Sequence, residues 1–502
     1  MNIIEELKKN TNKNPRKIAV YGERYVLTYE QFDKITDFFA KEIEDKLNKS
    51  EEAIMLNLEQ NETVLIAIYA ILKSGNTYVP IGKTMPKDRM RYIQHDSNCN
   101  FIISNKEEHG FKHVMKFTID DIGRVLQRES LIKENVLYNE EVTKYPYILY
   151  TSGSTGTPKG VKVTRKNLDY ILDNMQIICP VDNDSVYCFS TPYTFDISIT
   201  EIFGWIKGNG AVAVIGADLL KNHKCFLEKV KKFKISHFAT SPSALIMLLN
   251  LCTTEELDIL SNYIKYIMVA GEKFNPSIAQ IWEKHKFKSR MFNLYGPTEA
   301  TVYSTFYEIK HPYKGGDIPI GKPLKGTRVI IETNETDELG ELILFGDGIA
   351  EGYLNNIELT NTVFGQNQKG IKYYKTGDIC SYNEKGEIVY IGRKDQQVQI
   401  HGIRVELGDI EYYFAKQQNI ESVAVIYYDN KLFAFIKPLN DSFDLKIAKD
   451  MFISETPRYM QPNKYIVVDN MPLNDNRKID KKKLMLLASK NAGENMSSSQ
   501  KK

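Results

Sequence analysis

The stretch Tyr150-Thr-Ser-Gly-Ser-Thr-Gly-Thr-Pro-Lys-Gly160 concentrates hydroxyl groups, glycines and one lysine in a short segment between two apolar, strand-like runs. Glycines allow a tight turn that brings backbone N–H groups close to an anion. The stretch therefore predicts a loop that wraps a polyphosphate, although it is not a Walker A loop. A Gly/Ser linker is the alternative, and the flanking strands disfavour it. The expected phosphate contacts are Thr151, Ser152, Gly153, Ser154, Thr155, Gly156 and Lys159.

The composition indicates a globular protein with more than one domain. The chain has 502 residues, 42% hydrophobic and 26% charged, which is enough for several cores. A net charge of +2 gives no reason to expect nucleic acid or an anionic membrane as a partner. The six cysteines lack metal-ligand spacing and predict reduced thiols. Without a signal peptide or a long apolar run, we expect a cytoplasmic monomer.

The loop resembles the phosphate loop of the adenylate-forming superfamily, which includes acyl-CoA ligases, luciferases and the adenylation domains of nonribosomal peptide synthetases. The resemblance covers residues 15–485 and continues through Tyr295-Gly-Pro-Thr-Glu299, Tyr374-Lys-Thr-Gly-Asp378, the segment 392–411 and the segment 472–480. It implies a mixed α/β and α+β architecture. Residues 1–394 would form a large N-terminal adenylation core of layered sheets and helices. Residues 395–490 would form a small, mobile α+β lid, followed by a disordered polar tail over 491–502.

The resemblance also implies a site for ATP and Mg²⁺. Tyr295 would offer its ring to adenine, Asn293 its amide to the adenine edge, and Thr298 its hydroxyl to the α-phosphate. Glu299 would supply an oxygen ligand to Mg²⁺, and Asp378 would accept both ribose hydroxyls. A simple turn is the alternative interpretation of Tyr-Gly-Pro. The remaining nucleotide contacts would be Gly271, Glu272, Gly296 and Arg393.

Asp196 stands between Phe195 and Ile197, just before an apolar helical pattern. By itself such an Asp is typical of a helix N-cap. The resemblance instead implies that it pairs with the α-ammonium of an amino-acid substrate, since a carboxylate in apolar surroundings requires a partner. The acyl pocket would be completed by Ile197, Thr200, Ala239, Met268, Ala270, Leu294, Val302 and Tyr303.

The C-terminal part carries the remaining implied roles. Lys478 matches the catalytic lysine of the family, Asp395 matches its hinge, and Gly402 matches the strand that approaches the thiol after a domain rotation. The sequence departs from the family at Gln399, His401 and Arg477, where Lys, Arg and Gly are usual. At Gln399 and His401 the usual cation is missing, so one nucleotide or phosphate contact of the family is not expected here. We expect His401 to be a surface residue, and Lys478 keeps its place beside Arg477.

The expected activity is that of an ATP-dependent ligase of the AMP-forming, acid–thiol type. It would activate a large apolar or aromatic α-amino acid as aminoacyl-AMP and pass it to the phosphopantetheine thiol of a separate carrier protein. No carrier or condensation motif occurs in the sequence, so we expect a free-standing enzyme of nonribosomal peptide-type, antibiotic-related biosynthesis. Two alternatives remain. One is a D-alanine–carrier protein ligase for teichoic acid, and the other is an inactive nucleotide-binding protein with the same fold.

Overall fold

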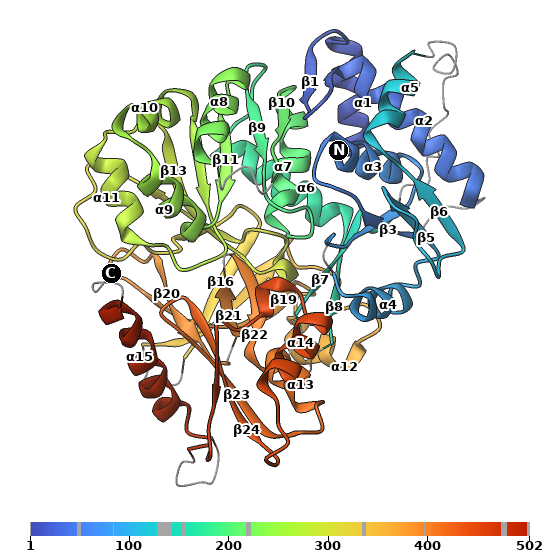
Figure 1. The fold of residues 1–502 in the computed structure, drawn as a ribbon. Helices are drawn as coiled ribbons and strands as arrows, with labels where there is room; N and C mark the ends of the chain where they lie inside the picture. The colour runs from blue at the N-terminus through green and yellow to red at the C-terminus, as the bar shows by residue number, and fades with distance from the viewer. Residues whose placement is uncertain are drawn as a thin grey trace. The chain divides into compact units, whose positions relative to one another are not determined.

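The structure, a computed structural model, describes residues 2–47, 52–83, 85–127, 143–152, 157–216, 222–333, 338–395, 397–400, 402–472 and 479–498 (Figure 1). The chain divides into two compact units. The first comprises Met1–Lys83, Gln94–Tyr150 and Gly160–Lys394, and the second comprises Thr84–Ile93, Thr151–Lys159 and Asp395–Lys502. Among the described helices, none combines the length and apolarity that a membrane crossing requires.

A nine-stranded sheet dominates the first unit, in the order β15-β14-β13-β12-β11-β9-β10-β1-β2. The strands β13, β12, β11, β9, β10 and β1, which are neighbours in this order, pair in parallel. At the two edges, β2 and the strands β14 and β15 pair antiparallel. In Figure 1 the helices α8 to α11 flank β9, β11 and β13. The strands are β1 Ile18–Tyr21, β2 Val26–Thr28, β9 Val186–Phe189, β10 Ala211–Val214, β11 His237–Thr240, β12 Tyr266–Val269, β13 Arg290–Tyr295, β14 Thr305–Ile309 and β15 Lys322–Pro323.

The first unit has two further sheets. One has six strands in the order β6-β5-β3-β4-β7-β8. The other has five strands, with the order β16-β17-β19-β18 and with β20 paired to β19. The six-stranded sheet consists of β3 Ala53–Asn57, β4 Thr77–Pro80, β5 Phe101–Ser104, β6 His113–Lys116, β7 Tyr147–Thr151 and β8 Lys159–Val163. The five-stranded sheet consists of β16 Thr327–Glu332, β17 Gly340–Gly346, β18 Phe364–Gln366, β19 Lys372–Tyr382 and β20 Ile388–Arg393.

Helices cover the sheets because they join parallel strands, which requires crossover connections. Helix α6 follows β8 and leads to the nine-stranded sheet, and it begins at a capping box formed by Thr164 and Asn167. The helices are α1 Ile3–Lys13, α2 Tyr29–Leu47, α3 Glu62–Lys73, α4 Lys87–Asp96, α5 Ile119–Gln127, α6 Arg165–Ile178, α7 Ile197–Phe203, α8 His223–Phe233, α9 Pro242–Leu251, α10 Thr254–Tyr263, α11 Pro276–Lys284 and α12 Ile357–Val363.

The second unit contains a sheet of β23, β24 and β25 with a different core on each face. Alternation along β24 directs Ala434 and Ile436 toward the core that includes α13 and α14, and Phe433 and Phe435 toward the one that includes α15. Helix α15 continues to Ser498, past Asn491, where the sequence predicted that the polar tail begins. The elements are β21 Gln397–Ile400, β22 Ile403–Glu406, α13 Leu407–Ala415, β23 Ile420–Tyr428, β24 Lys431–Pro438, α14 Leu445–Glu455, β25 Lys464–Val467 and α15 Lys481–Ser498.

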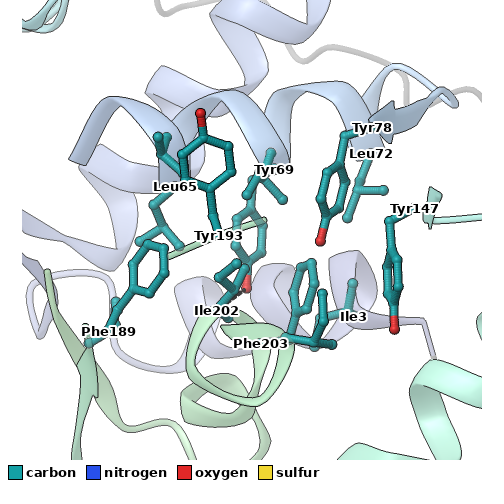
Figure 2. Close-up of a cluster of buried hydrophobic side chains, with 14 of the residues drawn as sticks. Ile3, Leu65, Tyr69, Leu72, Tyr78, Tyr147, Phe189, Tyr193, Ile202 and Phe203 are labelled. Carbon is teal, nitrogen blue, oxygen red and sulfur yellow. Dashed lines mark hydrogen bonds between the residues drawn. The ribbon is translucent and has the colours of Figure 1, made fainter. Parts of the chain in front are cut away.

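The largest core joins helix α3 to helix α7, which follows Asp196. Figure 2 shows Leu65, Tyr69 and Leu72 of α3 beside Ile202 and Phe203 of α7. The Tyr69 hydroxyl donates to the Ile202 carbonyl at 3.0 Å. Because both helices are buried against this core, the segment that carries Asp196 has a fixed support.

A buried ion cluster holds the end of α3 against α2. The Lys73 ammonium, 1% exposed, contacts Asp33 Oδ1 and Asp37 Oδ1, each at 2.6 Å. The other Asp33 oxygen contacts Lys8 at 3.1 Å. Burial favours the neutral acid, but Lys73 and Lys8 outweigh burial and hold the pKa of Asp33 below its ordinary value.

Replacing Lys73 by methionine should lower the stability of the first unit by about 3–5 kcal/mol, because it leaves the Asp33 carboxylate buried without its main partner. Scanning calorimetry would measure the expected fall in Tm. Lys8→Met is the matched control, since Lys8 contacts the same carboxylate from a side chain that is 42% exposed, and it should cost about 1 kcal/mol or less. Equal Tm values for Lys73→Met and the unmodified protein would contradict a stabilising role for this ion cluster.

Candidate active site

The predicted phosphate loop lies between β7 and β8. The structure describes Thr151, Ser152 and Lys159, whereas Gly153, Ser154, Thr155 and Gly156 lie outside the described residues. The buried Thr151 hydroxyl has no hydrogen-bond partner among the residues described. An unsatisfied hydroxyl at this position is suited to a ligand oxygen.

Tyr150 fixes the start of this loop. Its hydroxyl donates to Asp96 Oδ2 at 2.7 Å, and the Asn355 amide donates to the Asp96 carbonyl at 2.6 Å. A Cβ on Gly160 would lie 3.0 Å from the Tyr150 ring, so glycine is needed there for the ring to pack. Nothing in the local sequence pattern indicated the roles of Asp96 and Asn355, which come from distant segments.

Asp378, Arg393 and Tyr295 form one hydrogen-bonded group. Asp378 on β19 is directly opposite Arg393 on β20. The Arg393 guanidinium donates to Asp378 Oδ1 at 2.7 Å, and the Tyr295 hydroxyl donates to Asp378 Oδ2. Burial and the neighbouring Asp378 raise the pKa of Tyr295 well above its ordinary value, so the phenol stays protonated. The structure thus brings together three of the residues predicted to bind the adenosine.

Three other predicted nucleotide residues already have protein partners or a constrained backbone. The Asn293 amide is buried and donates to the Pro319 carbonyl at 2.9 Å, which leaves its oxygen as the group for a ligand. Glu272 accepts from the backbone N–H and hydroxyl of Ser243 at 3.0 and 2.7 Å. Gly271 adopts φ 89°, a left-handed conformation that favours glycine.

Glu299 lies in a short 3₁₀ turn, Thr298–Ala300, and is fully buried. Its Oε1 accepts from the Tyr353 hydroxyl at 2.8 Å. Tyr353 is a positioning residue that sequence reasoning missed, since the two residues lie on separate segments. The described residues contain no cluster of three or more His, Cys, Asp or Glu side chains able to hold a metal. One carboxylate fits Mg²⁺ that is bound mainly by substrate phosphates and water.

Asp196 occupies the N-cap position of α7, but its side chain makes no capping hydrogen bond. Instead, Asp196 Oδ2 accepts from the Thr298 hydroxyl at 2.6 Å. The carboxylate therefore faces the segment that carries the nucleotide residues, and the side-chain cap that the sequence alone suggested is not formed.

The predicted pocket residues lie at the carboxyl ends of neighbouring strands. Ala239 on β11 is directly opposite Met268 on β12, Ala270 follows β12, and Leu294 lies on β13. Ile197 and Thr200 come from α7. All except Asp196 are buried, and those with apolar side chains belong to one core together with Tyr303. The structure therefore assembles these separated positions around one region.

The last two predicted pocket residues, Val302 and Tyr303, follow a loop with a constrained backbone. Thr301 and Val302 adopt φ values of 57° and 69°, which are unfavourable for β-branched side chains. A Cβ on Gly296 would come within 2.5 Å of the Val302 carbonyl oxygen, so the chain can fold back here only over glycine. Strain of this kind persists where the surroundings fix the backbone, and it is common at functional sites.

Within the second unit, the Asp395 carboxylate accepts from the Gln397 N–H at 3.1 Å, and Gly402 adopts φ 78°. Gln399 lies on β21, opposite Arg404. Lys478, His401 and Arg477 lie outside the described residues.

Glu201 is a buried residue that sequence reasoning also missed. It is fully buried on α7, and its two oxygens accept from the N–H and hydroxyl of Thr191, each at 3.0 Å. Burial raises the pKa of Glu201 well above its ordinary value. The contact fixes the segment between β9 and Asp196.

Comparisons with known proteins bear on the family and the fold of this chain. The family model described as AMP-binding enzyme matches residues 7–354. Zwittermicin A synthase ZmaJ of Bacillus cereus is 31% identical over 95% of this chain and 93% of its own length. The D-alanine–D-alanyl carrier protein ligase of Bacillus licheniformis is 29% identical over 96% and 99%. The chain spans only 9% of a linear gramicidin synthase protein of Brevibacillus parabrevis, at 31% identity over 96% of this chain.

Among solved structures, the Vibrio cholerae adenylation domain AlmE, determined with glycyl-adenosine-5'-phosphate, has the same fold. Its TM-score is 0.82 at 20% identity, with 98% of each chain covered. The resemblance and the fold class predicted from the sequence are confirmed. The chain belongs to the AMP-binding enzyme family, in agreement with the resemblance to adenylate-forming enzymes.

Proposed function

We propose that this protein adenylates a large apolar or aromatic α-amino acid and transfers it to the phosphopantetheine thiol of a separate carrier protein. The observation that carries the proposal is the 2.6 Å hydrogen bond between Asp196 and Thr298. It joins the acid expected to bind the ammonium to the residue expected at the α-phosphate. The small pocket residues Thr200, Ala239 and Ala270 support a large side chain.

The proposed chemistry has two steps. An oxygen of the substrate carboxylate attacks the α-phosphorus of ATP, and the bond to the departing pyrophosphate breaks. The carrier thiolate then attacks the acyl carbon of aminoacyl-AMP, which releases AMP. Because the carboxylate is already a nucleophile, the protein's task is to orient the reactants and stabilise charge at phosphorus.

The residues have distinct parts in the first step. Asp196 would hold the ammonium, Thr298 the α-phosphate, and the group of Asp378, Arg393 and Tyr295 the adenosine. Lys478 would bridge the carboxylate and phosphate oxygens. Mg²⁺, held by the phosphates and Glu299, would neutralise phosphate charge. We place the boundary of the lid at Asp395. Rotation there would move Lys478 away from the site and bring the strand around Gly402 toward it.

D-alanine activation is the second candidate. The relative from Bacillus licheniformis, named as a D-alanine–D-alanyl carrier protein ligase, matches 96% of this chain. ATP–pyrophosphate exchange with the twenty standard amino acids and D-alanine would separate the two candidates. Exchange with a large apolar or aromatic amino acid supports the first, exchange with D-alanine alone supports the second, and no exchange at all contradicts both. Loading of a carrier protein added as a separate chain tests the transfer step.

Asp196→Asn keeps the shape of the side chain and removes its charge. We expect activation of the preferred amino acid to fall by a few kcal/mol of transition-state stabilisation, the scale for losing one partner of a buried charge pair. The matching des-amino acid, which the unmodified enzyme should reject, should become a comparable or better substrate. Pyrophosphate exchange with both acids measures this, with the exposed Asp258→Asn as control. If the unmodified enzyme accepts both acids equally, Asp196 does not bind an ammonium.

Lys478→Ala should lower pyrophosphate exchange by about a hundredfold or more, on the scale of losing one charge-stabilising contact in the transition state. Lys482→Ala is the control, since Lys482 is an exposed lysine nearby in the chain, and it should retain full exchange. An unchanged exchange rate in Lys478→Ala would refute the assignment of this lysine.

A further inference from the structure

Two tyrosine hydroxyls near the acyl pocket are buried without a hydrogen-bond partner. Tyr187 and Tyr303 are each 1% exposed, and neither hydroxyl makes a hydrogen bond of ordinary geometry within the described part of the chain. The side chain of Thr200, another predicted pocket position, lies close enough to Tyr303 to act on its pKa. Leaving a buried hydroxyl unsatisfied destabilises the folded protein. Such groups are rare in native structures, so a pair of them calls for an explanation.

Both side chains lie beside residues that form the pocket. Tyr303 is itself one of the predicted pocket positions. Tyr187 stacks on His237 at 4.5 Å between ring centres, and His237 is two residues before Ala239 on the same face of β11. A Cβ on Gly204 would lie 3.1 Å from the Tyr187 hydroxyl. Gly204 is one helical turn after Thr200, so the two residues lie on the same face of this helical segment.

Glu201, an acid that acts on the pKa of both tyrosines, already has protein partners. Burial, with Glu201 as the next cause for Tyr303, raises the pKa of both phenols well above their ordinary values, so both remain protonated. Both Glu201 oxygens accept from Thr191. A cationic substrate side chain would therefore find this acid occupied, whereas a neutral hydroxyl would find free phenol groups.

We propose that the Tyr303 hydroxyl, with Tyr187 beside it, hydrogen-bonds a hydroxyl group on the ring of an aromatic amino-acid substrate, for which tyrosine is the simplest example. This rests on the proposed amino-acid adenylation and narrows its substrate to aromatic side chains with a polar end. Two other buried phenols, Tyr78 and Tyr147, also lack partners among the described residues, but neither is a pocket position, and they carry no argument about the substrate.

Pyrophosphate exchange with two matched pairs, tyrosine with phenylalanine and serine with alanine, tests this proposal. The unmodified enzyme should prefer tyrosine over phenylalanine by about tenfold or more in kcat/KM, because phenylalanine leaves the pocket hydroxyls unpaired. In Tyr303→Phe that ratio should fall toward one. Equal use of tyrosine and phenylalanine, or use of the small pair alone, would overturn the inference while leaving amino-acid adenylation intact. No exchange with any amino acid would reject both.

Thermal unfolding gives a second, independent measurement. Tyr303→Phe removes an unpaired hydroxyl and should leave the Tm of the free enzyme unchanged or raised. Tyr193→Phe is the matched control, because its hydroxyl accepts from the Leu58 N–H at 3.0 Å and contacts the carbonyls of Leu58 and Ile81 at 2.9 Å. Its Tm should fall. A Tm loss in Tyr303→Phe equal to that control would show that the hydroxyl has a structural role, which overturns the inference.

Discussion

The parallel pairing of β9, β11, β12 and β13 is the constraint on which the candidate site depends. Parallel strands end at the same edge of a sheet, so whatever follows them meets in space. The segment that leads to Asp196 follows β9, the Ala270–Gly271 turn follows β12, and the turn containing Thr298 follows β13. The sheet thereby brings together predicted pocket residues and predicted nucleotide residues that lie up to about a hundred positions apart in the sequence. The core between α3 and α7 then fixes the helix that begins at Asp196.

Neutral hydroxyl donors hold the carboxylates of the site. Thr298 donates to Asp196, Tyr353 to Glu299 and Tyr295 to Asp378. A hydroxyl fixes the orientation of a carboxylate without cancelling its charge, whereas a lysine or arginine would neutralise it. Asp378 also contacts a cation, Arg393. A carboxylate that keeps its negative charge is the kind of partner that an ammonium group or a magnesium ion requires.

The sequence predicted the fold class and the family because their signals are local: a glycine-rich loop between strands, and short ordered stretches. The resemblance supplied the pocket positions, and the sequence pattern itself indicated only that Asp196 precedes a helix. It could not predict the pairing of Thr298 with Asp196 or of Tyr353 with Glu299, because these contacts join segments 102 and 54 residues apart. Nor could it predict the positive φ of Val302, since a β-branched residue argues locally against that conformation. The roles assigned to individual site residues stay predictions.

The strained turn at Thr301 and Val302 has a consequence for how this pocket can diverge in evolution. Ala239 and Met268 lie on regular strands, so substitutions there can reshape the predicted pocket one side chain at a time. Val302 has an unfavourable backbone conformation, Tyr303 follows it directly, and Gly296 beside them has no room for a side chain. Substitutions on this side must preserve the whole turn, which makes single changes there poor starting points for a new specificity. New substrate preferences should therefore arise first from the strand side of the pocket and reach the turn only through coordinated changes.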